Sequence, residues 1–288
     1  PGHGEDWAEK IAQECAALLG VPHARYELAV YGDPERSPQF GVTSPSFVAA
    51  GETMVHGNEL LAGIDVLYAE SAGGTRGTRS PQYTVELVVR TIEASAATLP
   101  PAGTLPASMQ TAADVLVGFL LVDAWIGNTD RHEENWAVIE SPPSVDAAVP
   151  GRVLAPYYDS ASCLGRNEPD AKRLRRLHTR DSGDTVDAYA ARARSAFGST
   201  PGGPERLTPV EAFARAAVLR PRAALAWLGR LAEVREPTVV DLLARIPPDR
   251  MSDPARGFAG QMLHYNRDRL LALRADVEAA AARPEETR

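Results

Sequence analysis

The sequence predicts an α+β fold that is mostly helical. Apolar residues recur with helical periodicity in several segments, and most of these segments follow residue 165. The strand-like segments are fewer and short, at residues 26–31, 40–47, 136–139 and 152–155. Because the chain becomes helical after residue 165, we expect helices to make up most of the fold.

Composition narrows the class of protein. The chain has 288 residues with 44% hydrophobic content, a net charge of −8 and a pI near 5.4, which is typical of a soluble globular protein. This acidic balance disfavours a surface built for nucleic acid or for an anionic membrane. The longest apolar run, residues 115–122, is too short to span a bilayer, and no signal-peptide pattern opens the chain. With Cys15 and Cys163 as its only cysteines, the chain is expected to be cytoplasmic and without disulfides.

The first elements are a helix and two strands. Residues 5–19 have helical periodicity, and Glu9 lies beside the apolar stripe, either as a solvated carboxylate or as a functional one. The strand at residues 40–47 contains a proline, which marks it as an edge strand or marks its end. In a nucleotide-binding protein this strand would lead into a hinge where the backbone of Phe47 and Val48 contacts adenine. A plain transition from strand to loop predicts the same residues.

The middle of the chain holds the most apolar helix. Residues 73–78 are rich in glycine but lack the lysine and the helix start of a phosphate-binding loop, so we expect a surface loop there. A helix at residues 81–97 follows. Residues 107–126 are apolar nearly all round, which predicts a buried central helix. Its Asp123 needs a partner, and either Arg131 or the loop backbone after the helix can supply one.

A dense polar loop follows this helix. Asp130 and Asn135 stand five residues apart, the D-x-x-x-x-N spacing of kinase catalytic loops. In that chemistry the aspartate accepts the proton of an attacking hydroxyl, and the asparagine oxygen helps to hold Mg²⁺. A second carboxylate, Asp159, follows the strand at residues 152–155, and Asn135 directly precedes the strand at residues 136–139. We therefore expect both ligands at facing ends of a hairpin, in the kind of site that Mg²⁺ prefers.

Helical patterns fill the rest of the chain. A basic run at residues 172–176 docks an acidic peptide or a phosphate, or it forms a solvated face, as charge runs usually do. A Gly- and Pro-rich connector is expected at residues 198–204. The remaining helices are predicted at residues 185–197, 208–219, 222–234, 238–245 and 252–282.

Two motifs together resemble a known family. The first runs from Ile126 to Asn135 as I-G-N-T-D-R-H-x-x-N, and the second runs from Leu154 to Ser162 as L-A-P-x-Y-D-x-x-S. This pair resembles the signature of HipA-like serine/threonine kinases. Weaker similarity to the same family extends over residues 7–12, 42–47 and 258–267.

The resemblance implies a fold, a reaction and a site. The fold would be a protein-kinase-like bilobal one, with residues 1–50 as the last part of a nucleotide-binding N-lobe and residues 51–288 as the helical C-lobe. The activity would be an ATP- and Mg²⁺-dependent phosphotransfer to a protein, in a toxin–antitoxin setting with an antitoxin-like partner. The implied site residues are Asp130 as catalytic base, Asn135 and Asp159 as magnesium ligands, Glu9 as partner of a nucleotide-binding lysine, and Asn128, Phe47 and Val48 as further nucleotide contacts.

The sequence departs from the kinase pattern in the N-terminal, nucleotide-binding elements. Kinases need a strand-borne lysine on the nucleotide phosphates, whereas Lys10 and Lys172, the two lysines here, lie outside the strand-like segments. The glycine-rich loop is also missing. Since the sequence starts at Pro1 and its first methionine is Met54, we expect a segment upstream.

Two other functions fit the same residues. One is a non-catalytic nucleotide-binding or regulatory module that retains the loop. The other is a lipid or small-molecule kinase, because D-R-H-x-x-N also resembles the catalytic loop of phosphoinositide 3/4-kinases. By that resemblance His132 would share or replace the role of Asp130; otherwise His132 braces the loop through a hydrogen bond.

Overall fold

Helices make up most of the computed structural model, which describes residues 4–32, 39–72, 80–100, 105–143 and 151–283. The glycine-rich run at residues 73–78 lies outside these ranges. The helices before the polar loop are α1 (Glu5–Leu19), α2 (Gly57–Ile64), α3 (Val66–Ala72), α4 (Val85–Ala94) and α5 (Ala112–Ile126). Those after it are α6 (Asp170–His178), α7 (Val186–Ala191), α8 (Pro209–Leu219), α9 (Pro221–Glu233), α10 (Glu236–Ala244), α11 (Asp253–Ala272) and α12 (Arg274–Ala281).

Helix α5 lies at the centre of the molecule, as its apolar sequence predicted. All of its residues are buried, and α1, α4, α8, α9 and α11 pack around it. The helix begins at Ala112 and not at residue 107, because Thr111 caps it by accepting the N–H of Asp114 at 3.2 Å. Gly118 lets a neighbouring helix approach closely, since a Cβ there would lie 2.7 Å from the ring of Trp227.

The strands form two small antiparallel sheets. Strands β1 (Glu27–Tyr31) and β2 (Gln39–Thr43) pair as a hairpin. Strand β2 ends at Thr43, before the predicted limit of residue 47, which agrees with the proline in that segment. The second sheet has the order β3-β4-β5, with β3 (Thr53–His56), β4 (Ala137–Ser141) and β5 (Gly151–Leu154). The sequence did not predict β3, which leads directly into α2.

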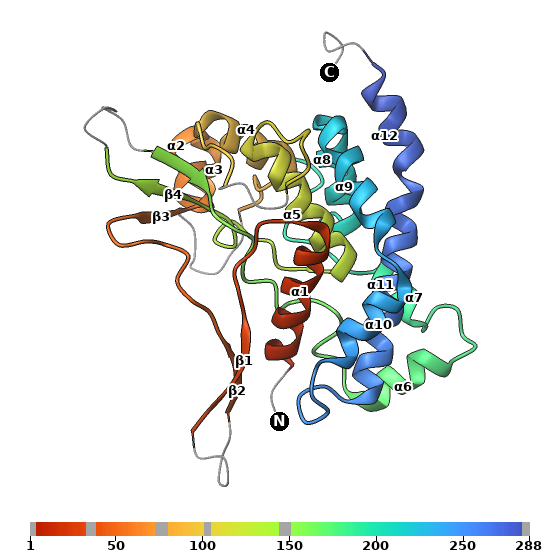
Figure 1. Ribbon diagram of the computed structural model, residues 1–288. Helices are drawn as coiled ribbons and strands as arrows, with labels where there is room; N and C mark the ends of the chain where they lie inside the picture. The colour runs from red at the N-terminus through yellow and green to blue at the C-terminus, as the bar shows by residue number, and fades with distance from the viewer. Residues whose placement is uncertain (1–3, 33–38, 73–79, 101–104, 144–150, 284–288) are drawn as a thin grey trace.

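The hairpin of β4 and β5 positions the polar loops. Val138 pairs with Leu154, so the chain enters β4 and leaves β5 at the same end of the sheet. Asn135 precedes β4 and Asp159 follows β5, and this confirms the predicted hairpin. In Figure 1 the strands lie on one side of α5 and α1, and the helices from α8 onward lie on the other.

A buried arginine anchors the β1–β2 hairpin to the helices. Arg250, which follows α10, donates to the carboxylate of Asp6 on α1 at 2.8 Å and to the carbonyl of Ala29 on β1 at 3.0 Å. Its guanidinium also lies 4.1 Å from the ring centre of Phe40 on β2. Because Arg250 and Asp6 are both buried, this pair holds the hairpin against α1.

Three segments of the helical region differ from their predictions. The predicted helix at residues 252–282 is interrupted at Leu273, between α11 and α12. The predicted helix at residues 185–197 ends at Ala191, because residues 195–198 pair with the chain near Leu207, where the Ser195 N–H donates to the Leu207 carbonyl at 2.7 Å. The predicted connector therefore starts within an ordered turn. Among the described helices, none combines the length and the apolar character needed to cross a membrane.

Candidate active site

A buried carboxylate on α5, Asp123, lies beneath the polar loops of the candidate site and binds residues from both. Arg131 donates to both of its oxygens, with Nε 2.8 Å from Oδ2 and Nη2 3.0 Å from Oδ1. The hydroxyl of Tyr157 donates a third hydrogen bond to Oδ1 at 2.6 Å. Burial is the largest single influence on the pKa of Arg131 and lowers it, but the charge of Asp123, together with Tyr157 and the hydrogen bonds to both residues, holds that pKa well above its usual value. Arg131, one of the two predicted partners of Asp123, is therefore its charged partner.

Arg131 also joins the two polar loops. Its Nη1 donates to the carbonyl of Asn135 and, at 2.9 Å, to the carbonyl of Tyr158. Its Nη2 donates to the hydroxyl of Ser160 at 2.7 Å, and its guanidinium carbon lies 4.3 Å from the ring centre of Tyr157. Arg131 is 1% exposed, so these contacts are made in a low-dielectric interior where they are strong. The loop after α5 and the loop after β5 are thus held by one side chain.

Asn128 fixes the first turn of the loop after α5. Gly127 ends the helix with φ of 66°, a conformation that favours glycine. Asn128 then donates to Asp123 Oδ1 at 2.7 Å and accepts the N–H of Asp130 at 3.0 Å. The sequence indicated Asn128 as a nucleotide contact, yet the residue is 1% exposed and both polar ends of its side chain are used. This geometry favours a role in positioning Asp130.

Asn135 bridges the two loops by contacting the backbone of both Asp130, the candidate base, and Asp159, the candidate metal ligand. Its Nδ2 donates to the carbonyl of Asp130 at 2.7 Å and lies 3.4 Å from the carbonyl of Asp159. The amide nitrogen is therefore occupied by the backbone carbonyls of the two aspartates. The amide oxygen, Oδ1, is the atom that can bind a cation. In the described ranges no donor contacts this oxygen.

Asp159 has an unusual backbone conformation. Its φ is +52°, in the left-handed region that residues other than glycine rarely adopt. Its N–H donates to the hydroxyl of Tyr26 at 3.2 Å, while its side chain is exposed. Among the described residues nothing donates a hydrogen bond to its carboxylate. Strained conformations of this kind cluster at functional sites, so the strain supports a functional role for this exposed carboxylate.

The oxygen atoms that Asp159 and Asn135 offer are suitable ligands for Mg²⁺. Among the residues that the structure describes, no three His, Cys, Asp or Glu side chains gather into a cluster that could hold a metal by itself. The site offers one carboxylate, from Asp159, and one amide oxygen, from Asn135. Mg²⁺ commonly binds to one or two protein oxygens and completes its octahedron with water and substrate phosphates.

Glu9, on α1, holds the loop that contains Asp159 through hydrogen bonds to its backbone. Both of its carboxylate oxygens accept the N–H of Ser160, at 2.8 and 3.0 Å, and its side chain also hydrogen-bonds with Tyr26. Burial raises the pKa of Glu9 to about 7, against the opposing effect of the Ser160 N–H. In the described part of the chain, neither lysine contacts Glu9; the Lys10 ammonium instead donates to the carbonyl of Tyr26 at 2.8 Å.

The raised pKa of Glu9 predicts a pH-dependent stability. The folded state binds the proton more tightly than the unfolded state, so the contribution is fully present below pH 4.5 and is lost as the pH rises through about 7. The loss amounts to about 3 kcal/mol in the free energy of unfolding. Glu9→Gln keeps an oxygen for the Ser160 N–H but cannot titrate. Denaturant unfolding without metal at pH 5 and pH 8 should show a smaller change in the variant; equal changes in both proteins contradict the prediction.

The other predicted site residues lie at the edge of this arrangement. His132 Nδ1 accepts the N–H of Glu134 at 3.1 Å, so the imidazole braces the loop through a backbone amide. Phe47 and Val48 are half-buried in an apolar cluster with Met54, with residues of β4 and with residues that follow β5. The ring centre of Phe47 lies 5.7 Å from that of Tyr158, directly before Asp159. The N–H of Val48 is hydrogen-bonded to the Ser46 hydroxyl at 3.2 Å, which an adenine would have to replace.

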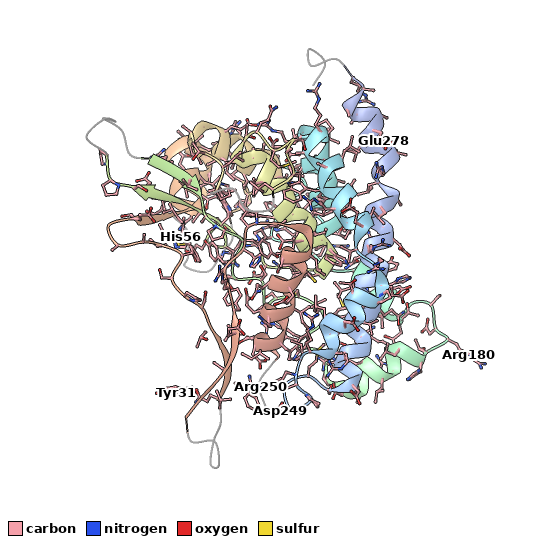
Figure 2. The ribbon with its side chains drawn as sticks, viewed as in Figure 1. Tyr31, His56, Arg180, Asp249, Arg250 and Glu278 are labelled. Atoms are coloured by element: carbon pink, nitrogen blue, oxygen red, sulfur yellow. The ribbon has the colours of Figure 1, made fainter. Side chains whose placement is uncertain are left out.

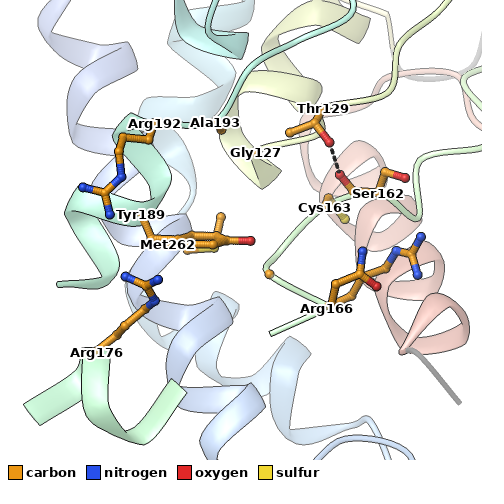
Figure 3. A pocket seen from close by; sticks show the side chains of 12 residues that line it. Gly127, Thr129, Ser162, Cys163, Arg166, Arg176, Tyr189, Arg192, Ala193 and Met262 are labelled. Atoms are coloured by element: carbon orange, nitrogen blue, oxygen red, sulfur yellow. Dashed lines mark hydrogen bonds between the residues drawn. The ribbon is translucent and has the colours of Figure 1, made fainter. Parts of the chain in front are cut away.

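A cavity of about 340 Å³ opens beside the two loops, on the side of α6, α7 and α11. Figure 3 shows Arg176, Tyr189 and Arg192 on one side of it, with Thr129, Ser162 and Arg166 on the other. Part of the basic run at residues 172–176 faces inward here. Residues 172 and 175 are exposed, as expected of a solvated face, whereas Arg173 is buried and Arg176 lines the cavity.

Several residues of the site were missed by the sequence reasoning. They are Tyr26 beside Asp159, Tyr157 and Ser160 around the Asp123–Arg131 pair, and the cavity residues Arg166 and Arg192. Tyr157 and Ser160 fall within the second motif, so their position in the sequence beside Asp159 could have indicated that they belong to the site. Tyr26 opens a predicted strand, and no pattern in the sequence connects it to a loop 133 residues away.

No protein-family model and no curated protein matches the chain. Solved structures share its fold, and two of them are as follows. One is the proinflammatory kinase CtkA of Helicobacter pylori, with 15% identity over 98% of this chain and 89% of that chain and a TM-score of 0.67. The other is in the complex of HipA, HipB and operator DNA from the toxin–antitoxin system of Shewanella oneidensis MR-1, with 12% identity over 96% of this chain and a TM-score of 0.52.

These likenesses confirm the predicted fold class. The chain has a mixed kinase-like fold with small sheets and a large helical lobe, and it spans 58% of the matched chain in the HipA complex. At such low identity the likeness concerns the fold, and fold alone does not fix an activity.

Proposed function

We propose that this chain, which has the fold of a HipA-like kinase, is the main part of an ATP- and Mg²⁺-dependent phosphotransferase acting on a protein Ser or Thr hydroxyl. Residues 1–50 would contribute to the nucleotide lobe and residues 51–288 would form the helical lobe. The observation that carries the proposal is the position of the Asn135 amide, whose nitrogen contacts the backbone carbonyls of Asp130 and Asp159. The side chain of Asp159 is exposed beside it.

In this proposal the chain contributes positioning and proton transfer. ATP supplies the phosphoryl group, and Mg²⁺ neutralises charge on its phosphates. Asp130 accepts the proton that the acceptor hydroxyl loses as its oxygen bonds to phosphorus, and ADP leaves as the bond to the bridging oxygen breaks. Asp159 and Asn135 Oδ1 would hold the metal, while Glu9 and Tyr26 hold the backbone of the Asp159 loop. The cluster around Phe47, Val48 and Tyr158 would contact adenine.

One observation favours a second candidate. No lysine in the described residues contacts Glu9, although kinases place a lysine on the nucleotide phosphates. A nucleotide-binding module without transfer activity fits this feature. The two candidates differ in phosphoryl transfer and share nucleotide binding.

We further propose an antitoxin-like partner for this chain. The support is the fold shared with HipA, whose structure contains HipB and operator DNA. The net charge of −8 disfavours direct contact between this chain and DNA, so a partner would supply any such contact.

Replacing Asp159 by asparagine tests the proposed metal site. Asparagine tolerates the left-handed backbone at this position, so the fold should be retained while the charge is lost. We expect the affinity for ATP in the presence of Mg²⁺ to fall on the order of a hundredfold, because the metal loses its only carboxylate ligand from the protein. Calorimetric titration with ATP, with Mg²⁺ and with EDTA, measures this.

The matched control is Asp276→Asn, which removes the same charge from the exposed face of α12. It should bind Mg²⁺-ATP as the parent protein does. Unchanged Mg²⁺-ATP affinity in Asp159→Asn, with a normal circular dichroism spectrum, would sink the assignment of Asp159.

A further inference from the structure

The cavity beside the loops lies where an acceptor would approach. Thr129, next to the proposed base Asp130, lines it, and so does Ser162, three residues after Asp159. Attacking and leaving oxygens lie roughly in line during phosphoryl transfer, so acceptor and nucleotide enter from opposite sides. The apolar cluster with Phe47 lies against β4 and the residues that follow β5, whereas the cavity lies against α6, α7 and α11. The cavity is therefore on the side left for the acceptor.

The lining of this cavity is basic. Arg166, Arg176 and Arg192 line it, and no carboxylate does so among the residues that the structure describes. Arg166 pairs with Glu5 at 2.8 Å and Arg176 also pairs with carboxylates, so Arg192 supplies the positive charge that no described carboxylate offsets. An uncompensated charge in a concave surface attracts ligands of the opposite charge.

Two of these arginines have contrasting environments. Arg176 is fixed by ion pairs with Glu168 at 3.2 Å and Asp184 at 2.7 Å, and its guanidinium lies 5.2 Å from the ring centre of Tyr189. Arg192 is exposed and donates one hydrogen bond, to the carbonyl of Gly183 at 2.9 Å. In the described ranges no carboxylate pairs with Arg192. Arg192 therefore presents an uncompensated charge, and Arg176 presents a preorganised one.

Guanidinium groups in this arrangement suit a planar or tetrahedral anion. Their forked donors match carboxylate and phosphoryl oxygens and can bind either through paired hydrogen bonds. The hydroxyl of Ser162 forms no hydrogen bond within the described residues and can add a further donor. An acidic side chain next to the acceptor residue would thus find charged and neutral donors together.

We propose that this cavity binds an acidic side chain of the acceptor protein, a carboxylate or a phosphoryl group close to the accepting Ser or Thr, with Arg192 as its main anchor. This inference rests on the proposed phosphotransfer, and it assigns the substrate class of that reaction. The cavity sets which hydroxyl reaches Asp130, because anchoring the neighbouring side chain fixes the position of the acceptor.

Peptide binding without nucleotide tests the inference independently of transfer. The probes are serine peptides that carry glutamate, phosphoserine or glutamine at one position, scanned around the serine, with affinities measured by fluorescence anisotropy. We expect an acidic peptide to bind at least about tenfold more tightly than its glutamine counterpart. Arg192→Gln should remove this difference, and Arg192→Lys should restore part of it. The glutamate and phosphoserine arms distinguish the two sources of negative charge.

Arg180→Gln is the matched control. Arg180 projects from the loop after α6 at the edge of the molecule, is exposed and does not line the cavity (Figure 2). Its replacement removes the same charge and should retain the preference for acidic peptides. Loss of the preference in both variants overturns the assignment to the cavity, since a general charge effect would then explain it.

Transfer assays with the same peptides separate this inference from the proposed function. Transfer without a preference for acidic peptides overturns the inference and leaves the phosphotransferase standing. A higher KM for ATP in Arg192→Gln, with unchanged peptide discrimination, also overturns it and assigns the cavity to nucleotide phosphates. Acidic preference in binding that Arg192→Gln removes, without transfer to any peptide, supports the cavity and contradicts the phosphotransferase. Failure of every peptide to bind overturns the inference.

Discussion

Replacing Asp130 by asparagine is expected to lower the rate of phosphoryl transfer by about 10²- to 10⁴-fold, the usual contribution of a general base. The backbone contacts of Asp130 do not depend on its carboxylate: its N–H donates to Asn128 and its carbonyl accepts from Asn135. The variant should therefore fold and bind Mg²⁺-ATP while losing the atom that accepts the proton. ADP release and phosphopeptide formation with a serine and threonine peptide library measure the effect.

Asp276→Asn on α12 is again the control for the loss of one charge. His132→Gln is the companion variant, because His132 is the other candidate for proton transfer. If His132 is the base, His132→Gln loses the rate and Asp130→Asn remains active. An Asp130→Asn protein as fast as the parent contradicts the assignment. A parent protein that binds Mg²⁺-ATP but transfers nothing supports the module without transfer activity.

Replacing Arg131 by methionine is expected to cost about 3–5 kcal/mol in the free energy of unfolding. Methionine fills similar volume, but it leaves Asp123 buried and without its charged partner, and the carbonyls of Asn135 and Tyr158 lose their donor. The cost of an unpaired buried charge exceeds what the pair itself contributes. Denaturant unfolding followed by circular dichroism measures the change.

A double variant isolates the cause of this loss. Asp123→Asn together with Arg131→Met removes both charges, so it should be more stable than Arg131→Met alone. As a control, Arg90→Met breaks the exposed ion pair of Arg90 with Asp65, which should cost no more than about 1 kcal/mol. A loss below about 1 kcal/mol in Arg131→Met would show that the buried pair does not hold the loops together.

Part of the site could be predicted because its residues are local in sequence. Asn135 immediately precedes a strand and Asp159 follows the strand that pairs with it, so strand patterns and a hairpin were enough to bring them together. The burial of α5 was equally readable, since nearly every position on that helix is apolar. Asp123, as the charged residue near the end of that helix, indicated that a partner such as Arg131 must exist.

Contacts between distant segments could not be predicted in this way. The resemblance implies that Glu9 pairs with a lysine, and no pattern in the sequence indicated that its carboxylate accepts the N–H of Ser160, 151 residues away. Strand β3 was missed because its partner, β4, lies beyond four intervening helices in the sequence. The cavity combines residues from α6, α7 and α11 with both polar loops, and no single segment contains its pattern.

The sequence by itself determined the mostly helical fold class, the central buried helix and the kinase-like spacing of Asp130, Asn135 and Asp159. These features depend on periodicity and on near neighbours, which each segment specifies locally. Only the tertiary structure decided that Arg131 joins the two loops, that Glu9 supports Asp159 from below, and that three arginines share one cavity. Such contacts depend on how distant segments pack, because the low dielectric of the interior rewards whichever polar partners the packing brings together.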